Sequence, residues 1–440
     1  MKLKTLYVCQ NCAFQSSKWQ GKCPECEAWN SFSEEVVNVG KPEATAKAGR
    51  VVRAMAAQKP QSFSSVSAGA PRTPTGIHEL DQVLGGGIVE GSLVLLSGEP
   101  GIGKSTLTLQ VVGKMADKKN SVLLITGEES VDQVSDRAKR LGLTQKNIQL
   151  LYETSLENLL LTIENEKPEF LVVDSVQVMA SEGSASMAGT LTQVRTVTEA
   201  IMSVIKRMNI PTLLIGHVNK DGNIAGPKVL EHLVDAVLLL EGERDQEFRM
   251  LRALKNRFGT VSEVGLFEMQ SSGLQEIKNP AERILESRPS GSHGTCLTMT
   301  LEGNRPLLME VQALATTTPF GYPKRASSGF DRNRLELLLA VLQKHSGLNF
   351  ADQDVYVNVV GGLRLNDPGA DLAICAALVS SLLKKPLEEK LVAFGEVGLT
   401  GEIRPAFRHG EREKNVKKLG LRAVKSELSL RKTLSLLTKV

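Results

Sequence analysis

The residues best suited to chemistry form the segment 98–106, which reads GEPGIGKST. It fits the phosphate-loop pattern G-x-x-x-x-G-K-[ST], in which backbone N–H groups wrap phosphate oxygens at a helix N-terminus. The lysine of such a loop reaches the outer phosphates and the hydroxyl ligates magnesium. The pattern predicts a nucleoside triphosphate ligand with Mg²⁺, and a structural glycine turn is the alternative. The expected nucleotide-binding residues are Gly98, Glu99, Pro100, Gly101, Ile102, Gly103, Lys104, Ser105 and Thr106.

Three carboxylates follow apolar runs and could complete this site. Asp174 ends the run FLVVD, and its position suits the acidic residue that holds magnesium through water, together with Ser105. Glu128 and Glu129 follow the run VLLIT, and one of them could be the general base for water. Capping of the next helix is the alternative for this pair. His217 follows a further strand and is either a γ-phosphate sensor or an ordinary loop histidine.

Short apolar runs separated by helical stretches must position these residues. The run 92–97 predicts a buried strand before the loop, and residues 106–115 predict a helix after it. Further strands are expected at 122–126, 170–174, 212–216 and 236–240. This alternation predicts an α/β fold with a mostly parallel sheet flanked by helices.

Four cysteines form a second constellation near the N-terminus. Cys9, Cys12, Cys23 and Cys26 give the spacing C-x2-C-x10-C-x2-C, which predicts one tetrahedral, structural Zn²⁺ site. A dithiol redox pair is the competing interpretation. The metal would supply most of the folding free energy of a module spanning residues 1–35, so chelation should unfold it. A linker is expected at 36–70.

Both tryptophans of the chain, Trp19 and Trp29, belong to this module. They could stack on nucleic-acid bases, but packing over the cysteine pairs is the favoured prediction.

The composition sets wider limits. The chain has 440 residues, 41% of them hydrophobic, and a formal net charge of +4, so its total charge does not indicate nucleic acid binding. The last 37 residues, from Arg404 onward, hold eleven Lys and Arg against three Asp and Glu, which predicts a local basic surface or a solvated tail. The start of the chain lacks a hydrophobic leader, and no apolar run approaches the ~20 residues of a membrane helix. A cytoplasmic protein without membrane contact is expected.

Several segments together resemble one family. The stretch TPTGIHELDQVLGGGIVEGSLVLLSGEPGIGKST, followed by GEES, LVVDSVQ, IGHVNKDGNIAGPKVLEHLVD and LKNRFG, resembles the RadA (Sms) family of bacterial DNA repair proteins, relatives of the RecA recombinases. The family pentapeptide is matched by Lys255, Asn256, Arg257, Phe258 and Gly259.

The resemblance implies a RecA-like ATPase that forms a homo-oligomeric, hexameric ring on single-stranded DNA. It implies branch migration of recombination intermediates, driven by ATP, with a recombinase and a replicative helicase as partners. Lys255 and Arg257 could reach ATP phosphates of a neighbouring subunit or phosphates of DNA, and a tight turn with solvated charges is the plain alternative. Lys104, Glu128, Glu129 and Asp174 would be catalytic.

By the same analogy, two polar loops at 179–192 and 219–228 are expected to contact DNA. The basic residues nearest them are Arg195, Lys220 and Lys228.

The C-terminal part, 291–440, is expected to form a separate α+β domain after the ATPase domain at 71–275. Strands are predicted at 296–301 and 355–360, and helices at 334–344 and 370–383. Its segments GGLRLNDPGADLAICAALVSS and LVAFGEVGLTGEIRPAFRHGEREKN resemble the proteolytic domain of Lon proteases. The Ser-Lys dyad of that domain is absent, because the serine segment reads Asp367-Pro368-Gly369-Ala370-Asp371 and Arg412 aligns with the lysine.

Ser380 and Ser381 are expected on an apolar helix that faces a packed interface. The final segment, 423–440, departs from the family pattern.

The leading hypothesis is therefore a zinc-containing, DNA-stimulated ATPase of recombinational repair that moves branches on single-stranded or branched DNA. An ATP-dependent protease and a nucleotide-switched DNA-binding scaffold are the alternatives.

Overall fold

The structure, a computed structural model, describes residues 3–10, 14–38, 71–184, 186–216, 227–242, 248–319, 321–361, 364–425 and 429–438. The chain divides into two compact units. The first comprises 1–241 and 249–276, and the second comprises 242–248 and 277–440. None of the helices in the described part of the chain has both the length and the apolar character needed to cross a membrane.

A three-stranded antiparallel sheet forms the N-terminal module, with the order β2-β1-β3. Its strands are β1 (Leu3–Cys9), β2 (Gln15–Ser16) and β3 (Phe32–Asn38). Cys9, Cys23 and Phe32 form its small core, against which Tyr7 and Phe14 pack. The module reaches Asn38, so the predicted start of the linker at residue 36 is wrong. The rest of that predicted linker, 39–70, lies outside the described residues.

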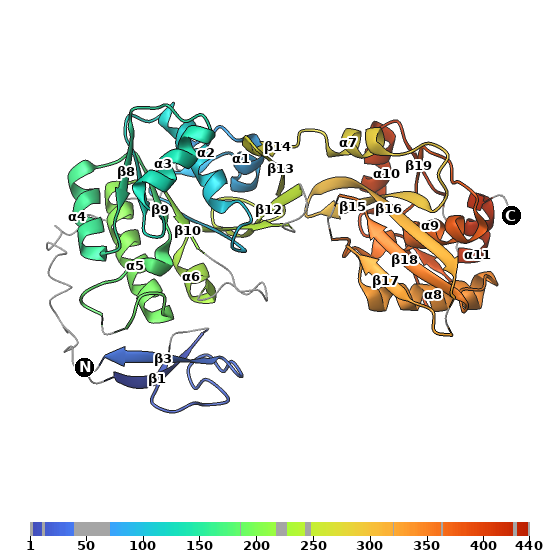
Figure 1. Cartoon of the computed structure of the whole chain (residues 1–440), viewed down its shortest axis with the longest axis horizontal. Coiled ribbons are helices and arrows are strands. Elements are labelled where there is room, and N and C mark those ends of the chain that lie inside the picture. Colours follow the sequence, from blue (N-terminus) through green and yellow to red (C-terminus); the bar gives the residue numbers. More distant parts are fainter. Residues whose placement is uncertain are drawn as a thin grey trace, which may run out of the picture. The chain divides into compact units, whose positions relative to one another are not determined.

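A nine-stranded sheet forms the ATPase-like part of the first unit, in the order β14-β13-β12-β11-β6-β10-β9-β7-β8 (Figure 1). The six strands from β11 to β8 pair in parallel, which confirms the predicted parallel sheet. They are β6 (Leu93–Gly98), β7 (Val122–Thr126), β8 (Ile148–Tyr152), β9 (Phe170–Asp174), β10 (Thr212–Ile215) and β11 (Ala236–Glu241). An extension of β12 (Phe248–Asn256), β13 (Val264–Gln270) and β14 (Gly273–Glu276) was not predicted, and β12 joins β11 antiparallel.

Helices cover both faces of this sheet, so its central strands are apolar on both sides. Val94 and Leu96 of β6 belong to one core, and Leu93 and Leu95 belong to the other. The first core includes side chains of α1 (His78–Leu84), α2 (Lys104–Ala116) and α3 (Val131–Arg140). The second includes side chains of α4 (Leu156–Glu166), α5 (Leu191–Met208) and α6 (Pro227–Leu233). The short strands β4 (Arg72–Thr73) and β5 (Ile88–Val89) pair beside them, and Val176–Val178 forms a 3-10 turn after β9.

The second unit is an α+β domain built on the sheet β17-β18-β16-β15-β19-β22. Its described strands are β15 (Thr295–Glu302), β16 (Arg305–Thr317), β17 (Arg325–Ser328), β18 (Gln353–Val359), β19 (Leu391–Val392), β20 (Glu396–Val397), β21 (Ile403–Arg404) and β22 (Arg422–Ala423). Its helices are α7 (Pro280–Ser287), α8 (Arg332–Ser346), α9 (Asp371–Leu383), α10 (His409–Lys418) and α11 (Leu430–Thr438), with a 3-10 turn at Pro368–Ala370.

Helix α7 packs on the core of this unit, which therefore begins near residue 277 and not at the predicted residue 291.

Candidate functional site

The phosphate loop occupies the predicted turn between β6 and α2. Gly103 caps α2 with a left-handed φ of 116°, and a Cβ there would lie 2.6 Å from Met269 Cε. Glycine suits this position because the left-handed backbone conformation disfavours any side chain, and a Cβ would also force Met269 to move. Lys104 is 4% exposed, and its Nζ donates hydrogen bonds to the carbonyls of Gly98 (2.8 Å) and Glu99 (2.9 Å). The loop thus holds a buried ammonium group where a helix N-terminus would receive phosphate oxygens.

Burial lowers the pKa of Lys104 to about 8, and the charges of Asp174 and Glu128 act in the opposite direction. The charge effect on this pKa places both carboxylates in the electrostatic environment of the loop. Asp174 and Ser105 also line one small cavity beside the loop, together with Thr126 and Arg137. The donor set therefore suits Mg²⁺, which prefers oxygen ligands.

Glu128 and Glu129 have different partners, although they are adjacent in sequence. Glu128 accepts a hydrogen bond from the hydroxyl of Ser175, next to Asp174. Glu129 forms an ion pair of 2.6 Å with Arg137 of α3, and its backbone bonds the hydroxyl of Thr126. Helix α3 begins with a capping box made by Ser130 and Gln133, so neither glutamate caps it with its side chain.

Arg249 is a residue of the site region that the sequence analysis missed. It is 3% exposed on β12, and its Nε donates to the carbonyl of Ile102 in the phosphate loop at 3.2 Å. The only signal available was an arginine within the apolar alternation of FRMLRALKN, in a strand that was not predicted.

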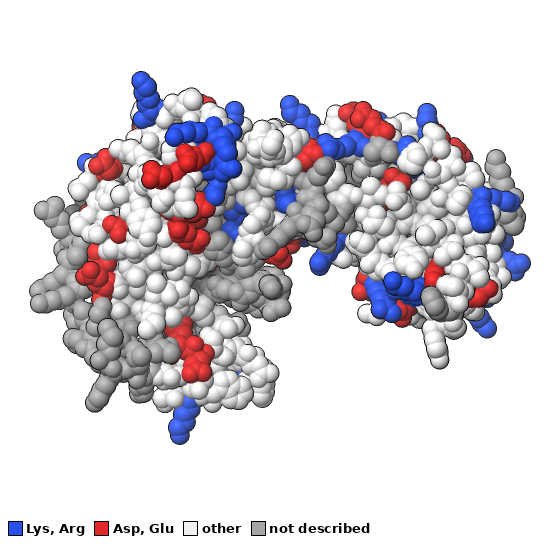
Figure 2. All heavy atoms as spheres, in the orientation of Figure 1, with Lys and Arg blue, Asp and Glu red and all other residues white. Residues whose placement is uncertain are grey.

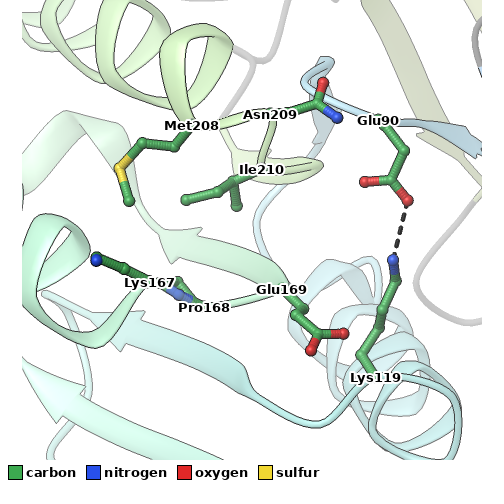
Figure 3. Close-up of a pocket in the computed structure, with 8 residues that line it drawn as sticks. All are labelled: Glu90, Lys119, Lys167, Pro168, Glu169, Met208, Asn209 and Ile210. Carbon is green, nitrogen blue, oxygen red and sulfur yellow. Dashed lines mark hydrogen bonds and ion pairs between the residues drawn. The ribbon is translucent and has the colours of Figure 1, made fainter.

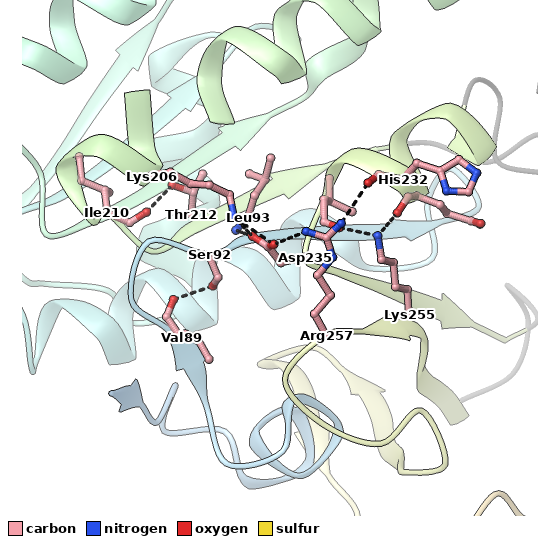
Figure 4. Close-up of polar contacts among 12 residues, drawn as sticks. Val89, Ser92, Leu93, Lys206, Ile210, Thr212, His232, Asp235, Lys255 and Arg257 are labelled. Atoms are coloured by element: carbon pink, nitrogen blue, oxygen red, sulfur yellow. Dashed lines mark hydrogen bonds and ion pairs between the residues drawn. The ribbon is translucent and has the colours of Figure 1, made fainter. Parts of the chain in front are cut away.

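The pentapeptide spans the end of β12 and the turn that follows it, and its polar side chains bond to neighbouring segments of the ATPase core (Figure 4). Lys255 Nζ donates to the carbonyls of Val234, at 2.9 Å, and Glu231 at the end of α6. Arg257 forms an ion pair of 3.2 Å with Asp235 and donates to the carbonyl of His232 at 3.4 Å. The pair of cations therefore faces the C-terminal end of α6, where carbonyl groups concentrate negative charge. The turn of the plain alternative is present, and both cations have protein partners although the side chain of Arg257 is 51% exposed.

Asp235 is the buried acceptor at the centre of this contact. It is 1% exposed, and its carboxylate accepts hydrogen bonds from Lys206, at 3.0 Å, and from the N–H of Leu93, at 3.1 Å, in addition to Arg257. The remaining pentapeptide groups hold the turn: Asn256 Nδ2 donates to the carbonyls of Val83 and Leu84, and Asn256 Oδ1 accepts from the N–H of Phe258. Gly259 lies against the backbone of Gly85.

The pentapeptide and the phosphate loop lie at opposite ends of the central strands. Lys255 pairs with Val237 at the start of β11, whereas Leu240 of β11 pairs with Gly98. The start of β11 lies beside Val94 of β6, so about 13 Å of strand separates the two sites at ~3.3 Å per residue. In this arrangement Lys255 does not contact the phosphate loop of its own chain.

The described cysteines of the N-terminal module converge as predicted. The Sγ atoms of Cys9, Cys23 and Cys26 all lie within 4.8 Å of one another, and those of Cys9 and Cys26 are 3.6 Å apart. Sulfur ligands about 2.3 Å from a tetrahedral ion require separations of roughly this size. Cys12 lies outside the described residues. The two tryptophans do not pack over the cysteines, because Trp19 is 56% exposed and Trp29 is 73% exposed. The predicted packing of the tryptophans is therefore wrong. Tyr7, Phe14 and Phe32 pack with the cysteines instead.

One contact joins this module to the ATPase core. Glu35 of β3 is 5% exposed, and its carboxylate accepts hydrogen bonds from the N–H of Leu191 (3.0 Å) and the hydroxyl of Thr192 (3.2 Å). These groups form the first turn of α5, directly after the loop at 179–190. A carboxylate is favourable at this positive helix end.

The residues expected to contact DNA are only partly described. Arg195 lies on α5 and forms an ion pair of 2.8 Å with Glu199. Lys228 lies in the first turn of α6, but its side chain is not among those described. Lys220 and His217 lie outside the described residues. DNA contact by these residues stays a prediction.

A cavity of about 330 Å³ lies beside the starts of the central strands, whereas the phosphate loop follows the end of β6. Figure 3 shows the residues that line this cavity. Its lining residues come from segments just before β6, β9 and β10 and just after α2. Glu90 and Lys119 form a 2.9 Å ion pair there. Of the predicted site residues that the structure describes, none lines it. The lining residues are Glu90, Lys119, Lys167, Pro168, Glu169, Met208, Asn209 and Ile210.

In the second unit, Arg412, which aligns with the Lon lysine, forms an ion pair with Asp367, the first residue of the segment that aligns with the Lon serine region. Arg412 is 1% exposed and donates to Asp367 at 2.6 Å, to the carbonyl of Met299 at 2.6 Å and to that of Phe407 at 2.9 Å. Ser380 and Ser381 are buried as predicted, and they accept hydrogen bonds from the backbone N–H groups of Gly294 and Ala315.

Part of the basic excess after residue 403 is used internally. Arg412 pairs with Asp367, Arg408 with Glu411 and Arg422 with Glu388. On the face shown in Figure 2, basic and acidic side chains are interspersed over both units, without one continuous basic surface. Residues 430–438 of the tail that departs from the family pattern form α11, whose Leu430 and Leu434 are buried.

Together, the doubly covered parallel sheet and the phosphate loop define a RecA-like P-loop ATPase preceded by a zinc ribbon. A family profile described as "ATPase: KaiC" matches residues 73–156, and a "Rubredoxin metal binding domain" profile matches residues 7–34. The chain is 46% identical over 422 residues to the DNA repair protein RadA of Bacillus subtilis, covering 96% of this chain and 92% of that protein.

It is also 46% identical over 421 residues to RadA of Haemophilus influenzae, covering 95% of this chain and 91% of that protein. The structure of a KaiC-like protein from Pyrococcus horikoshii aligns with 48% of this chain and 100% of its own, with 21% identity and a TM-score of 0.40. The chain belongs to the RadA family of DNA repair proteins.

Proposed function

We propose that this protein is an ATP-driven motor that hydrolyses ATP in response to single-stranded DNA and moves the branch points of recombination intermediates. The observation that carries the proposal is the placement of the pentapeptide at the opposite end of the central strands from the phosphate loop. Cations so placed act on a neighbouring subunit's nucleotide or on DNA. The first role requires an assembly of subunits, and a hexameric ring is the proposed one.

In the proposed chemistry, water attacks the γ-phosphate of ATP and gives ADP and inorganic phosphate. Backbone N–H groups of residues 98–106 would hold the phosphates, and Lys104 would contact the outer ones. Ser105 and Asp174 would hold Mg²⁺, which would neutralise charge that develops on the phosphate oxygens.

Glu128 is the better candidate for the general base. It contacts Ser175 and acts on Lys104, whereas the carboxylate of Glu129 is bound to Arg137. A base of this kind orients the water and accepts its proton.

We propose that helix α6 couples the nucleotide site to DNA binding. It follows the segment 217–226, which comes directly after the end of β10, and its other end is held by Lys255 and Arg257. Arg195, Lys220 and Lys228 are the proposed phosphate contacts along the DNA. The binding they give would be independent of sequence and weakened by salt.

The three described cysteines and Cys12 would hold a structural Zn²⁺, since four thiolates leave no open coordination position. Recombinase and replicative helicase are the proposed protein partners, and the cytoplasm the proposed location.

A protease is the less supported alternative. The segment aligned with the Lon serine region contains no serine, and the lysine position holds the buried Arg412, which does not act as a base. We propose that the second unit is a scaffold for ring assembly and DNA contact.

The test is multiple-turnover ATP hydrolysis with and without single-stranded DNA. The native protein should turn over ATP repeatedly and faster with DNA, and Lys104→Ala should abolish turnover. Lys114→Ala is the matched control, because Lys114 is exposed on the same helix and distant from the loop. Unchanged hydrolysis in Lys104→Ala would overturn the proposal. A single turnover without DNA response would favour the nucleotide-switched scaffold instead.

A further inference from the structure

Exposure of both tryptophans on the zinc ribbon is unexpected for so small a module. A core of about 35 residues gains most from burying its largest apolar side chains. Yet Trp19 and Trp29 are 56% and 73% exposed, while Cys9, Cys23 and Phe32 form the core. The core of the module therefore does not include its two tryptophan side chains.

The two indole rings border the same backbone position. A Cβ placed on Gly21 would lie 3.7 Å from Cη2 of Trp19 and 4.0 Å from Cζ3 of Trp29. Both six-membered rings therefore flank a residue that has no side chain. Because more than half of each tryptophan is exposed, part of both ring surfaces is accessible to a flat ligand.

Hydrogen bonds and the cysteine cluster hold this arrangement in place. Lys22 and Trp29 form an antiparallel bridge, and the N–H of Asn30 donates to the carbonyl of Gly21 at 2.8 Å. The intervening turn contains Cys23 and Cys26, whose sulfur atoms belong to the metal-ligand cluster. Aromatic rings on a turn fixed in this way lose little conformational freedom when a ligand binds.

Two lysines lie beside the rings, and the exposed Glu25 and Glu27 in the intervening turn balance their charge. Lys18 is exposed next to Trp19, and Lys22 is exposed and forms an ion pair of 3.4 Å with Glu27 at the surface. Aromatic faces combined with lysines suit unpaired nucleotides, because every base has a π-face and every link carries a phosphate.

We propose that Trp19 and Trp29 form a stacking platform for unpaired bases of single-stranded DNA. This inference rests on the proposed function, because it takes DNA as the substrate of the ATPase. A protein partner that inserts its own side chains between the rings is the competing occupant, and the experiment separates the two.

The chain itself supplies the probe, because Trp19 and Trp29 are its only tryptophans. The full-length protein is titrated with oligothymidylate while its tryptophan fluorescence is recorded. Stacking should quench the emission. An oligonucleotide of equal length without bases carries the same phosphates and should leave the emission unchanged.

Substitutions give the second measurement. Trp19→Ala and Trp29→Ala should each weaken oligothymidylate binding by about five- to hundredfold, the range that corresponds to stacking of one base. Trp19→Phe and Trp29→Phe are the matched controls and should retain most of the affinity. Bound zinc per chain, measured on each variant, reports whether the module is still folded. If an alanine variant loses its zinc, the DNA affinity of the phenylalanine variants and the quenching of the native protein test the stacking platform instead.

Emission that stays constant while the same DNA stimulates ATP hydrolysis would overturn the platform and leave the proposed function standing. Equal quenching by the oligonucleotide without bases, or unchanged DNA affinity in folded alanine variants, would also overturn it. The last result would assign the rings to a protein partner. Absence of both DNA binding and DNA-stimulated hydrolysis would instead contradict the proposed function.

Discussion

At the scale of single residues, the candidate site depends on a buried lysine and two adjacent glutamates with different partners. The residue types and spacing predicted the phosphate loop, because its chemistry requires those residues within one short segment. The sequence did not distinguish Glu128 from Glu129, because the distinction comes from Ser175 and Arg137, which are distant in sequence. Arg249 was missed for the same reason: its contact with Ile102 exists only after β12 joins the sheet.

The pKa of Lys104 predicts a pH dependence of ATP binding. Burial lowers this pKa to about 8, and phosphate oxygens should raise it in the complex because they favour the ammonium form. Below pH 8 the lysine is charged in both states, and affinity should not depend on it. Above pH 8 binding must take up a proton, so affinity should fall by about tenfold per pH unit until the pKa of the complex is reached.

Dissociation constants for ATP, measured from pH 7 to 9.5 as a function of pH, check this prediction. Lys104→Arg stays charged over this range and should show a flat profile. An identical decline in the arginine variant would assign the pH dependence to another group.

The two glutamates should respond differently to neutralisation. Glu128→Gln should reduce ATP turnover by about 10²–10⁴-fold and leave ATP binding intact, because a general base acts only in the chemical step. Glu129→Gln should have a much smaller effect on turnover, since Glu129 is bound to Arg137. The two variants are compared by their rates of single-turnover hydrolysis and their affinities for nucleotide. A larger loss in Glu129→Gln would reverse the assignment.

At the scale of elements, strands that are apolar on both faces were the easiest to predict. Strands β7 and β9 have the predicted bounds, because short apolar runs between helices indicate buried parallel strands. Strand β8 lies at the sheet edge and is only partly buried, and it was not predicted. Strands β12 to β14 escaped prediction because they carry charged and polar residues among the apolar ones.

Asp235 and Lys255 should separate stability from motor function. Asp235→Ala leaves the buried N–H of Leu93 without its acceptor and two half-exposed cations without their partner, and should lower the free energy of unfolding by about 1–3 kcal/mol. Lys255→Ala removes one partly exposed cation and should cost less stability, but it should impair DNA-stimulated hydrolysis. Denaturant unfolding and hydrolysis assays on the same preparations test both statements.

Lys206→Ala is the matched control, because Lys206 also binds Asp235 but lies outside the pentapeptide. It should retain DNA stimulation. If Lys206→Ala and Lys255→Ala lose DNA stimulation equally, the pentapeptide has no special role in the coupling.

At the scale of the whole molecule, two compact units and a small metal module share one chain. The order of these parts followed from the sequence, because cysteine spacing, the phosphate loop and the Lon-like segments occur in separate regions. The exact boundaries of the parts could not be predicted from the sequence. Strand β3 extends the metal module to Asn38, and α7 packs on the second unit. The exposure of Trp19 and Trp29 was also not predictable, since aromatic residues in small modules are usually buried.

Metal removal should unfold one part of the chain only. The cysteine cluster forms most of the core of the N-terminal module, whereas the ATPase sheet has two separate hydrophobic cores. A chelator should therefore abolish the ordered environment of the tryptophans and leave most of the far-ultraviolet circular dichroism unchanged. Loss of the helical signal at the same chelator concentration would show that the ATPase core depends on the metal.

Branch migration on a synthetic three-stranded DNA junction tests the central claim most directly. The native protein should convert the junction to products in the presence of ATP and Mg²⁺, with activity that declines as salt concentration rises. Lys104→Ala should be inactive, and Lys255→Ala should lose branch migration while it remains folded. Conversion of the junction by Lys104→Ala at the native rate would contradict the account.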